Sequence, residues 1–371
     1  MATDPTSTDP TSTAPVSDPV SPDPVSTGAD PALVGPLLAE VLGDDAWRSP
    51  SVTLIAGGKS NLTYVVASPA GEVVLRRPPL GHVLPTAHDM VREHTVMAAL
   101  AGSPVPVPRM LHLHRDPALL GAPFYVMEKV DGYVCRAELP LGYADAPSQR
   151  RAIGEGLVRV LADLHEVEPR AVGLDGLGRP QGYLARQVSR WVTQWEATRV
   201  PGGEAVDALA ADLAAGVPAT QRDTVVHGDY RLDNVMLAPH APGDIAAVLD
   251  WEMATLGDPL ADVGILLVYW SQADDDVTRR DGTVVPAATV LPGFPTRAEV
   301  AELYAARTGL DLTPLPWYVA FGFFKLAVVC AGIAARVAGG AMVGSGFEGM
   351  ADRIAPLTAL GRATLVRGTV G

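Results

Sequence analysis

The feature that most constrains this chain is a dense group of polar residues that follows a short β-rich run. The segment HGDYRLDN (residues 227–234) comes directly after this run. A second run, AAVLD (246–250), ends at Asp250, sixteen residues after Asn234, and leads into DWE (250–252). We expect the two strand ends to bring Asp229, Asn234 and Asp250 together. This spacing suits phosphoryl transfer, in which an Asp accepts the hydroxyl proton while an Asn and a second Asp hold Mg²⁺ on the nucleotide phosphates. The alternative is a solvated turn rich in Asp and Asn, and both strand contexts argue against it.

The remainder of the chain predicts an α+β protein of two lobes. Apolar and β-branched runs predict strands at 51–55, 62–67, 72–76, 110–114 and 124–130, and apolar periodicity predicts helices at 31–42, capped by Asp30, and 86–100. Helical periodicity then covers 150–168, 182–197 and 204–215 and resumes from Leu260 to the C-terminus. We therefore expect a β-rich lobe over 32–131 and a mainly helical lobe over 132–371. The Pro-, Ser-, Thr- and Asp-rich residues 1–31 predict a disordered tail.

Composition restricts the partners and the compartment. With 28 Lys+Arg against 42 Asp+Glu, the net charge of −14 argues against nucleic-acid binding. Two cysteines, Cys135 and Cys330, cannot form a disulfide framework, and the N-terminal residues lack the basic and apolar regions of a signal peptide, so we expect a cytoplasmic protein. Residues 315–335 are apolar enough to span a membrane, but the central Lys325 favours a buried core helix.

The segments HGDYRLDN and LDWE resemble the signature of the aminoglycoside phosphotransferase-like kinases, distant relatives of the protein kinases. The resemblance implies a bilobal protein-kinase-like fold that binds ATP and Mg²⁺ between its lobes. It makes Asp229 the catalytic base, Asn234 and Asp250 the Mg²⁺ ligands, and His227 a support for the loop. Arg231 would stabilise charge on the transferring phosphate, and the alternative is a surface arginine.

The resemblance also implies nucleotide contacts in the β-rich lobe. In AGGKSN (56–61), the backbone of Gly57 and Gly58 and the hydroxyl of Ser60 would lie over the phosphates, although a plain hairpin turn is the alternative. The segment FYVMEKV would be the hinge between the lobes, where backbone groups from Met127 to Val130 contact adenine. These hinge contacts come from the family resemblance alone.

Strand alternation in EVVLRR places Val74 and Arg76 on one face, at the Ala and Lys positions of the kinase V-A-I-K strand. Arginine thus stands where the family usually has lysine, and the two side chains are not interchangeable. Arg77 or Lys59 could instead contact the phosphates. Glu93 would be the helix partner that orients Arg76, and a solvent-facing glutamate is the alternative.

Three further acidic residues follow the second strand. Glu252 could be an additional Mg²⁺ ligand or a brace for the loop. We expect Asp258, with Pro259 at the first helical position, to cap the next helix, and Asp262 to face back toward the catalytic loop. Both are expected to be structural.

Segments such as GGKSNLTY (57–64) and GAPFYVMEKVDG (121–132) look like those of the phosphotransferase domain fused to acyl-CoA dehydrogenases in animals, which is associated with hydroxylated acyl-CoA or hydroxy-acid substrates. Arg186 and Arg190 share one helix face and could anchor an anionic acceptor, whereas aspartates 274–276 could serve a cationic one. We expect a small-molecule hydroxyl acceptor that is a hydroxyacyl-CoA or a hydroxy acid. An aminoglycoside acceptor is one alternative, and a nucleotide-binding pseudokinase, suggested by Arg76, is the other.

Overall fold

The computed structural model describes residues 28–56, 61–79, 89–200, 203–282, 287–339 and 349–370. Its strands are β1 (Ser51–Ala56), β2 (Leu62–Ser68), β3 (Gly71–Arg77), β4 (Met110–His114), β5 (Phe124–Glu128), β6 (Thr224–Val226), β7 (Val235–Leu237), β8 (Ile245–Val248) and β9 (Thr255–Gly257). Its α-helices are α1 (Pro31–Leu42), α2 (Met90–Leu100), α3 (Pro147–Glu166), α4 (Tyr183–Thr198), α5 (Glu204–Ala215), α6 (Leu260–Tyr269), α7 (Val277–Asp281), α8 (Arg297–Thr308), α9 (Leu315–Ala338) and α10 (Ile354–Arg367). Short 3₁₀ turns lie at Asp45–Arg48, Leu232–Asn234, Trp251–Met253, Ala288–Val290 and Ala351–Arg353.

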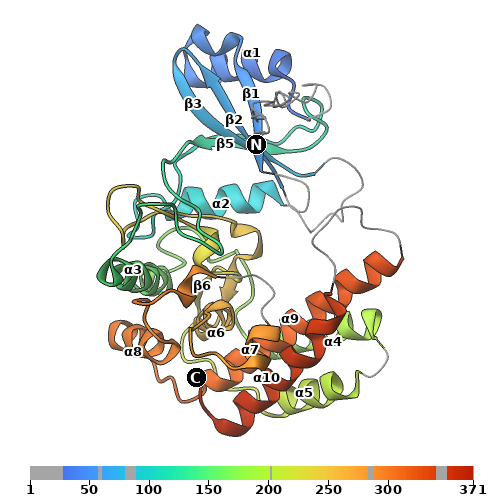
Figure 1. Ribbon diagram of the computed structural model, residues 1–371. Coiled ribbons are helices and arrows are strands. Elements are labelled where there is room, and N and C mark those ends of the chain that lie inside the picture. The colour runs from blue at the N-terminus through green and yellow to red at the C-terminus, as the bar shows by residue number, and fades with distance from the viewer. Residues whose placement is uncertain are drawn as a thin grey trace, which may run out of the picture.

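One antiparallel sheet of five strands, in the order β1-β2-β3-β5-β4, dominates the N-terminal part (Figure 1). Because neighbouring side chains of a strand point to opposite faces, the sheet has two apolar surfaces. Leu75 and Val126 pack with residues of α1, whereas Val74 and Tyr125 belong to the cluster that contains the apolar residues of α2. Helices therefore cover both faces of the sheet, and the face toward α2 joins the core of the helical part.

The five predicted strands of this sheet are confirmed, as is the leading helix. Asp30 caps α1 by accepting a hydrogen bond from the Ala32 N–H at 2.8 Å, and Pro31 is the first helical residue. Pro31 is also the last residue of the predicted tail, of which residues 1–27 lie outside the described part. The fifth strand is shorter than predicted, because β5 ends at Glu128.

The second helix begins later than predicted. α2 starts at Met90, because Asp89 has extended backbone angles and its carboxylate accepts the Arg92 N–H at 3.0 Å, and residues 86–88 of the predicted helix lie outside the described part. An Asp at this position satisfies one of the free N–H groups of the first turn. The sequence pattern contains this cap, but the apolar spacing alone extends the helix past it.

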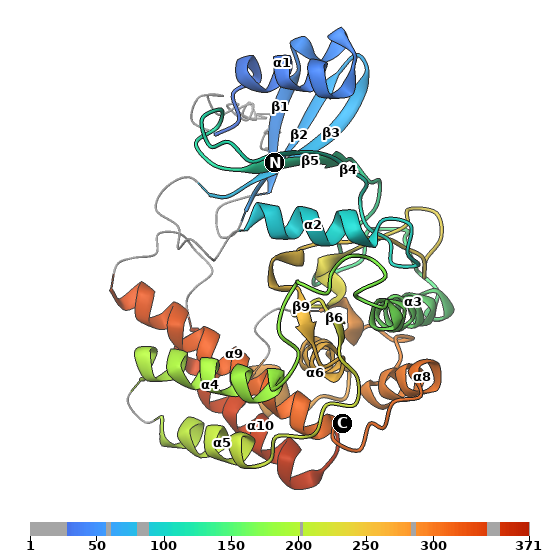
Figure 2. The same cartoon turned by 180° about the vertical axis from the view of Figure 1, so that it is seen from behind.

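The C-terminal part is mainly helical, as predicted, and α9 runs through its centre. α9 packs against α4, α6 and α10, which lie around it in Figure 2. It is long and apolar enough to cross a membrane, but 72% of its most apolar window is buried inside the protein. α9 is therefore a core helix of this fold. Cys135 and Cys330 are both free and buried.

Two small ladders lie next to the catalytic segment, where we expected two adjacent strands. β6 pairs with β9 and β7 pairs with β8, in separate two-stranded sheets. We predicted that the second strand would end at Asp250, but β8 ends at Val248, and Asp250 has φ 65° and ψ 57°. This left-handed conformation is uncommon for a residue with a side chain and ends the extended run.

Candidate active site

Backbone hydrogen bonds to Asp262 fix the loop that follows β6. The two carboxylate oxygens of Asp262 accept the N–H groups of His227 at 2.6 Å and of Gly228 at 2.7 Å, so Asp262 faces the catalytic loop as predicted. The His227 Nε2 lies 2.8 Å from the Leu249 carbonyl, which agrees with the predicted bond to backbone. Gly228 has φ 87°, and a Cβ there would lie 2.8 Å from Met253, so only glycine fits.

Buried partners hold the two aspartates around the start of α6. Asp258 accepts the Leu260 N–H at 3.0 Å, but the helix begins at Leu260 with Pro259 as its N-cap, one residue later than predicted. Burial alone would raise the pKa of Asp262, but the hydrogen bond from His165 at 3.2 Å and those of the loop amides hold this pKa below its ordinary value. Asp262 therefore stays ionised and anchors the loop.

The loop brings Asp229, Asn234 and Arg231 together. The Asn234 side-chain amide donates to the Asp229 backbone oxygen at 2.8 Å and to its carboxylate at 2.9 Å. The Arg231 Nε lies 3.3 Å from the Asp229 carboxylate and 3.2 Å from Asp233, and its guanidinium lies 4.4 Å from the centre of the Tyr269 ring. The Arg231 side chain is only 17% exposed, so it is not a surface arginine.

Arg76 joins the β-rich sheet to the second acidic segment. Its Nε lies 3.2 Å from Glu93 and its Nη2 lies 2.7 Å from Asp250. Glu93 is fully buried and also accepts hydrogen bonds from Asn61 at 2.7 Å and from the Tyr125 hydroxyl at 2.8 Å. Burial alone would lower the pKa of Arg76, but Tyr125, Glu93 and Asp250 raise it. Glu93 is therefore the partner of Arg76 and not a solvent-facing residue.

Of the alternatives to Arg76, Arg77 points away from this site. Its guanidinium donates to the carbonyl oxygens of Gly28 and Leu120 on the other side of the sheet. Lys59 lies outside the described residues, as do Gly57, Gly58 and Ser60 of the predicted phosphate loop. Among the described candidates, Arg76 is the one that faces the catalytic segment.

The two predicted hinge residues occupy different positions. Met127 lies inside β5, where it pairs with Val74 of β3 and Met110 of β4, so strands flank it on both sides. Val130 lies two residues beyond the end of β5 and is half-buried. Of the two, Val130 therefore lies outside the strand, where the chain leaves the sheet.

Three carboxylates gather beside Arg76. Oxygen atoms of Glu93, Asp250 and Glu252 lie within 4.8 Å of one another. Burial, with the nearby charges of Asp250 and Glu93, raises the pKa of Glu252 to about 7. The Leu249 N–H donates to the Asn234 backbone oxygen at 2.8 Å, which places Asn234 next to the chain that leads to Asp250. Carboxylate and amide oxygens are the donors that Mg²⁺ prefers, so this donor set fits Mg²⁺.

The sequence did not predict that Glu93 and Asn61 would lie with this group of carboxylates. Glu93 was expected only as the partner of Arg76, yet it also lies with Asp250 and Glu252. Asn61 was part of the AGGKSN segment without a role of its own, and its amide reaches Glu93. The long separation of Glu93 from the acidic segment leaves no spacing rule by which sequence could join them.

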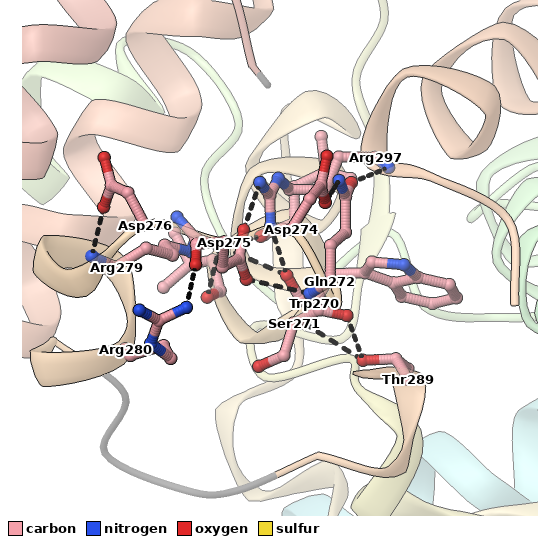
Figure 3. Close-up of polar contacts among 12 residues, drawn as sticks. Trp270, Ser271, Gln272, Asp274, Asp275, Asp276, Arg279, Arg280, Thr289 and Arg297 are labelled. Carbon is pink, nitrogen blue, oxygen red and sulfur yellow. Dashed lines mark hydrogen bonds and ion pairs between the residues drawn. The ribbon is translucent and has the colours of Figure 1, made fainter. Parts of the chain in front are cut away.

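The aspartates at 274–276 form hydrogen bonds and an ion pair with other residues of the protein (Figure 3). Asp275 is buried, pairs with Arg297 at 2.6 Å and accepts the Gln272 N–H at 2.8 Å. Asp274 accepts from the Gln272 side chain at 3.0 Å, and Asp276 caps α7. These contacts disfavour the use of this run as an anchor for a cationic substrate.

The two predicted anion-binding arginines of α4 also differ. Arg186 folds back and donates to the backbone oxygens of Arg179 and Gln181, which precede the helix. Arg190 is exposed one turn further along α4. One member of the pair is therefore structural, and the other is accessible.

Comparison with known proteins places this site in a family. A model described as the phosphotransferase enzyme family matches residues 51–305. The chain belongs to this family. This phosphotransferase is 37% identical over 283 residues to acyl-CoA dehydrogenase family member 10 of Mus musculus, and 32% identical over 301 residues to acyl-CoA dehydrogenase family member 11 of Homo sapiens. The matches cover 75% and 79% of this chain but only 26% and 37% of those relatives.

Solved structures confirm the predicted fold of this phosphotransferase. A candidate aminoglycoside phosphotransferase from Ralstonia eutropha has a TM-score of 0.73 and 34% identity, and the match covers 86% of this chain and 93% of that one. An aminoglycoside phosphotransferase APH(4)-Ia, in a ternary complex with ADP and hygromycin B, has a TM-score of 0.58 at 16% identity, with 91% and 99% covered. The five-stranded antiparallel sheet followed by a mainly helical part is thus the kinase-like fold of this family.

Proposed function

We propose that this phosphotransferase moves the γ-phosphate of Mg-ATP to the hydroxyl group of a small anionic acceptor, a hydroxyacyl-CoA or a hydroxy acid. The observation that carries the proposal is the convergence of Asp229 and Asn234 in one loop with Arg76 and Asp250 beside it. Phosphoryl transfer needs a base, metal-binding oxygens and a cation in such an arrangement.

In this proposal Asp229 takes the proton of the acceptor hydroxyl. The hydroxyl oxygen then forms a bond to the γ-phosphorus, and the bond from that phosphorus to ADP breaks, with its electron pair remaining on ADP. Asn234 orients the Asp229 carboxylate through its amide, and Arg231 stabilises the negative charge of the transferring group. Mg²⁺ held by Asn234 and Asp250 would neutralise charge on the phosphates.

Arg76 is the proposed cation for the nucleotide phosphates. Glu93 fixes its guanidinium through the Nε, so the rest of the planar fork points toward Asp250 at the catalytic segment. Distant members of the fold carry ADP, as in the APH(4)-Ia complex, or GDP, as in an aminoglycoside phosphotransferase bound to kanamycin. We propose that ATP is the phosphate donor of this chain, and GTP should be assayed in parallel.

Two observations favour an anionic acceptor over an aminoglycoside. The relatives with the same domain carry the name of acyl-CoA dehydrogenases, which points toward acyl compounds. The aspartates at 274–276, the acidic run that sequence offers for ammonium groups, are bonded within the protein. Because the chain is 34% identical to the candidate aminoglycoside phosphotransferase from Ralstonia eutropha, aminoglycosides are included among the acceptors to be tested.

The test is ADP release from Mg-ATP, and from GTP in parallel, with a panel of medium-chain hydroxyacyl-CoAs, free hydroxy acids, aminoglycosides, choline and homoserine. Asp229→Asn should lower kcat on the true acceptor by about 10²- to 10⁴-fold, the usual contribution of a general base. Asp244→Asn removes an exposed carboxylate and serves as the matched control.

The outcomes separate the candidate functions. Turnover on a hydroxyacyl compound that Asp229→Asn loses supports the proposal, and turnover on aminoglycosides alone replaces its acceptor. Calorimetric binding of Mg-ATP without transfer to any member of the panel would instead favour the nucleotide-binding pseudokinase. Full activity in Asp229→Asn would show that Asp229 is not the base.

A further inference from the structure

A single lysine lies in the apolar middle of α9. Tyr318, Gly322 and Lys325 follow one another at helical spacing, so they share one face of the helix. This face meets α6: a Cβ on Gly322 would lie 2.8 Å from a Val268 methyl group. On its other side Lys325 faces α4, where its Nζ lies 5.5 Å from the centre of the Trp191 ring. Lys325 thus lies where α4, α6 and α9 meet.

The Lys325 ammonium group is partly buried and has no polar partner among the described residues. In the part of the chain that the structure describes, it forms no hydrogen bond and no ion pair, and the Trp191 ring is its only cation–π contact. Burial lowers the pKa of Lys325, while the carboxylates of Asp229 and Asp262 raise it, so Lys325 feels the charge of the proposed base. Both carboxylates already accept hydrogen bonds from other donors.

A second cation, Arg190, precedes the Trp191 that contacts Lys325. Arg190, beside Trp191 on α4, is exposed, and its charge lowers the pKa of Lys325. Arg190 too forms no hydrogen bond or ion pair within the described residues. Carboxylates are plentiful in this chain, which has 42 acidic residues against 28 basic ones. Within the described residues, neither Lys325 nor Arg190 is therefore in ion-pair contact with any of these carboxylates.

We propose that Lys325 and Arg190 form the site that binds an anionic group, carboxylate or phosphate, of the hydroxyl acceptor. That this anion belongs to a hydroxyl acceptor rests on the proposed function, whereas the anion-binding site itself does not depend on it. The Trp191 ring lies beside Lys325 and offers an apolar surface to the part of the acceptor between this group and the hydroxyl. An anion supplies the missing partner of both cations, whereas the ammonium groups of an aminoglycoside are repelled.

Calorimetry with two matched pairs of probes tests the site directly. 3-Hydroxydecanoate and its amide differ in one carboxylate, and 4′-phosphopantetheine and pantetheine differ in one phosphate. We expect the anionic member of one pair to bind the wild-type protein more tightly than its neutral partner. Lys325→Met should weaken that binding about tenfold or more, as loss of one partner of a desolvated charge pair does. Lys325→Arg should retain most of it.

A control variant separates a local effect from a change of net charge. Arg307→Met removes one positive charge from α8, where Arg307 lies 3.3 Å from Asp163, and should leave the binding of every probe unchanged. Lys325→Gln is the second neutral variant, to be used if Lys325→Met does not fold. Weakening for the hydroxy acid identifies a carboxylate, and weakening for 4′-phosphopantetheine identifies a phosphate.

The inference fails if no anionic probe binds the wild-type protein more tightly than its neutral partner, or if the Lys325 variants bind as the wild type does. Equal weakening in Arg307→Met would also overturn it. Because binding needs no turnover, Lys325-dependent binding without phosphate transfer would reject the proposed function and keep this site. Transfer to an acceptor whose KM is the same in Lys325→Met would keep the function and reject this site.

Discussion

The two sides of the catalytic loop differ in how their charges are satisfied. On the sheet side, Arg76 pairs with both Glu93 and Asp250, and each of these groups is held by the protein. On the helical side, Lys325 and Arg190 have no carboxylate partner among the described residues. The sheet side thus has its geometry fixed before any ligand arrives, whereas the helical side leaves its charges for a ligand to neutralise.

This difference matches what each side is proposed to recognise. Every kinase of this fold must bind the same phosphates, so a rigid, internally paired cation suits the nucleotide. Acceptors differ between members, and a site that distinguishes them can use charges that stay unpaired until the correct partner binds. The comparison predicts that removing the paired cation Arg76 and removing the unpaired cation Lys325 change stability in opposite directions.

The largest effect is expected on the paired side. Arg76→Met removes the cation beside Glu93, which is fully buried, and leaves that carboxylate with only two neutral donors. Breaking a buried pair in this way lowers the free energy of unfolding by about 3–5 kcal/mol. Urea denaturation measures it, and Arg109→Met is the control, because Arg109 is exposed and lies 3.6 Å from Glu128.

The control should change the free energy of unfolding by less than about 1 kcal/mol, as exposed pairs do. If Arg76→Met is no more destabilising than Arg109→Met, the sheet side is not a fixed network. The contrast between a paired sheet side and an unpaired helical side would then not hold.

A smaller loss is expected where the helical part anchors the catalytic loop. Asp262→Asn removes the charge that accepts the His227 and Gly228 N–H groups, and hydrogen bonds to a charged group contribute about 1.5–3 kcal/mol. The pKa of Asp262 is lowered in the folded state, so its contribution is complete above the unfolded carboxyl pKa and is lost as pH falls through the folded value.

Unfolding experiments at neutral pH and at successively lower pH measure this loss. The difference in unfolding free energy between wild type and Asp262→Asn should shrink as the solution is acidified. A difference that stays constant with pH would mean that the Asp262 charge does not stabilise the loop. Asp281→Asn, at the end of α7, supplies an exposed carboxylate as control.

The parts of the site that sequence predicts well are local. Asp229 and Asn234 lie in one short loop, so their spacing alone brings them together, and the alternation of β3 correctly places Arg76, not Arg77, on the face toward Glu93. Their roles in catalysis stay predictions. β7 and β9, with three residues each, are too short for a period-2 pattern and were missed.

The contacts that sequence does not predict join distant segments. Asp250 bonds Arg76 across 174 positions, and Asn61 bonds Glu93 across 32. No periodicity encodes such pairs, because they depend on how the sheet, α2 and the loop after β8 pack. Lys325 is the reverse case: the sequence shows a charge in an apolar helix, which predicts a buried helix, but only the structure shows that no carboxylate of the described residues pairs with it.

The smallest expected change, and the one of opposite sign, is Lys325→Met on the unpaired side. Methionine fits the apolar surroundings of α9 and removes a partly buried ammonium group whose charged form burial disfavours and which has no hydrogen-bond partner among the described residues. We expect the free energy of unfolding to stay the same or to rise by up to about 1 kcal/mol, in the range of single stabilising substitutions. Thermal and urea unfolding, with Lys325→Arg as the charge-retaining control, measure it. A loss as large as that of Arg76→Met would show that Lys325 is held by the folded protein as firmly as Arg76. A stable variant that no longer binds the anionic probe would show that the fold keeps this cation for its ligand, at the expense of stability.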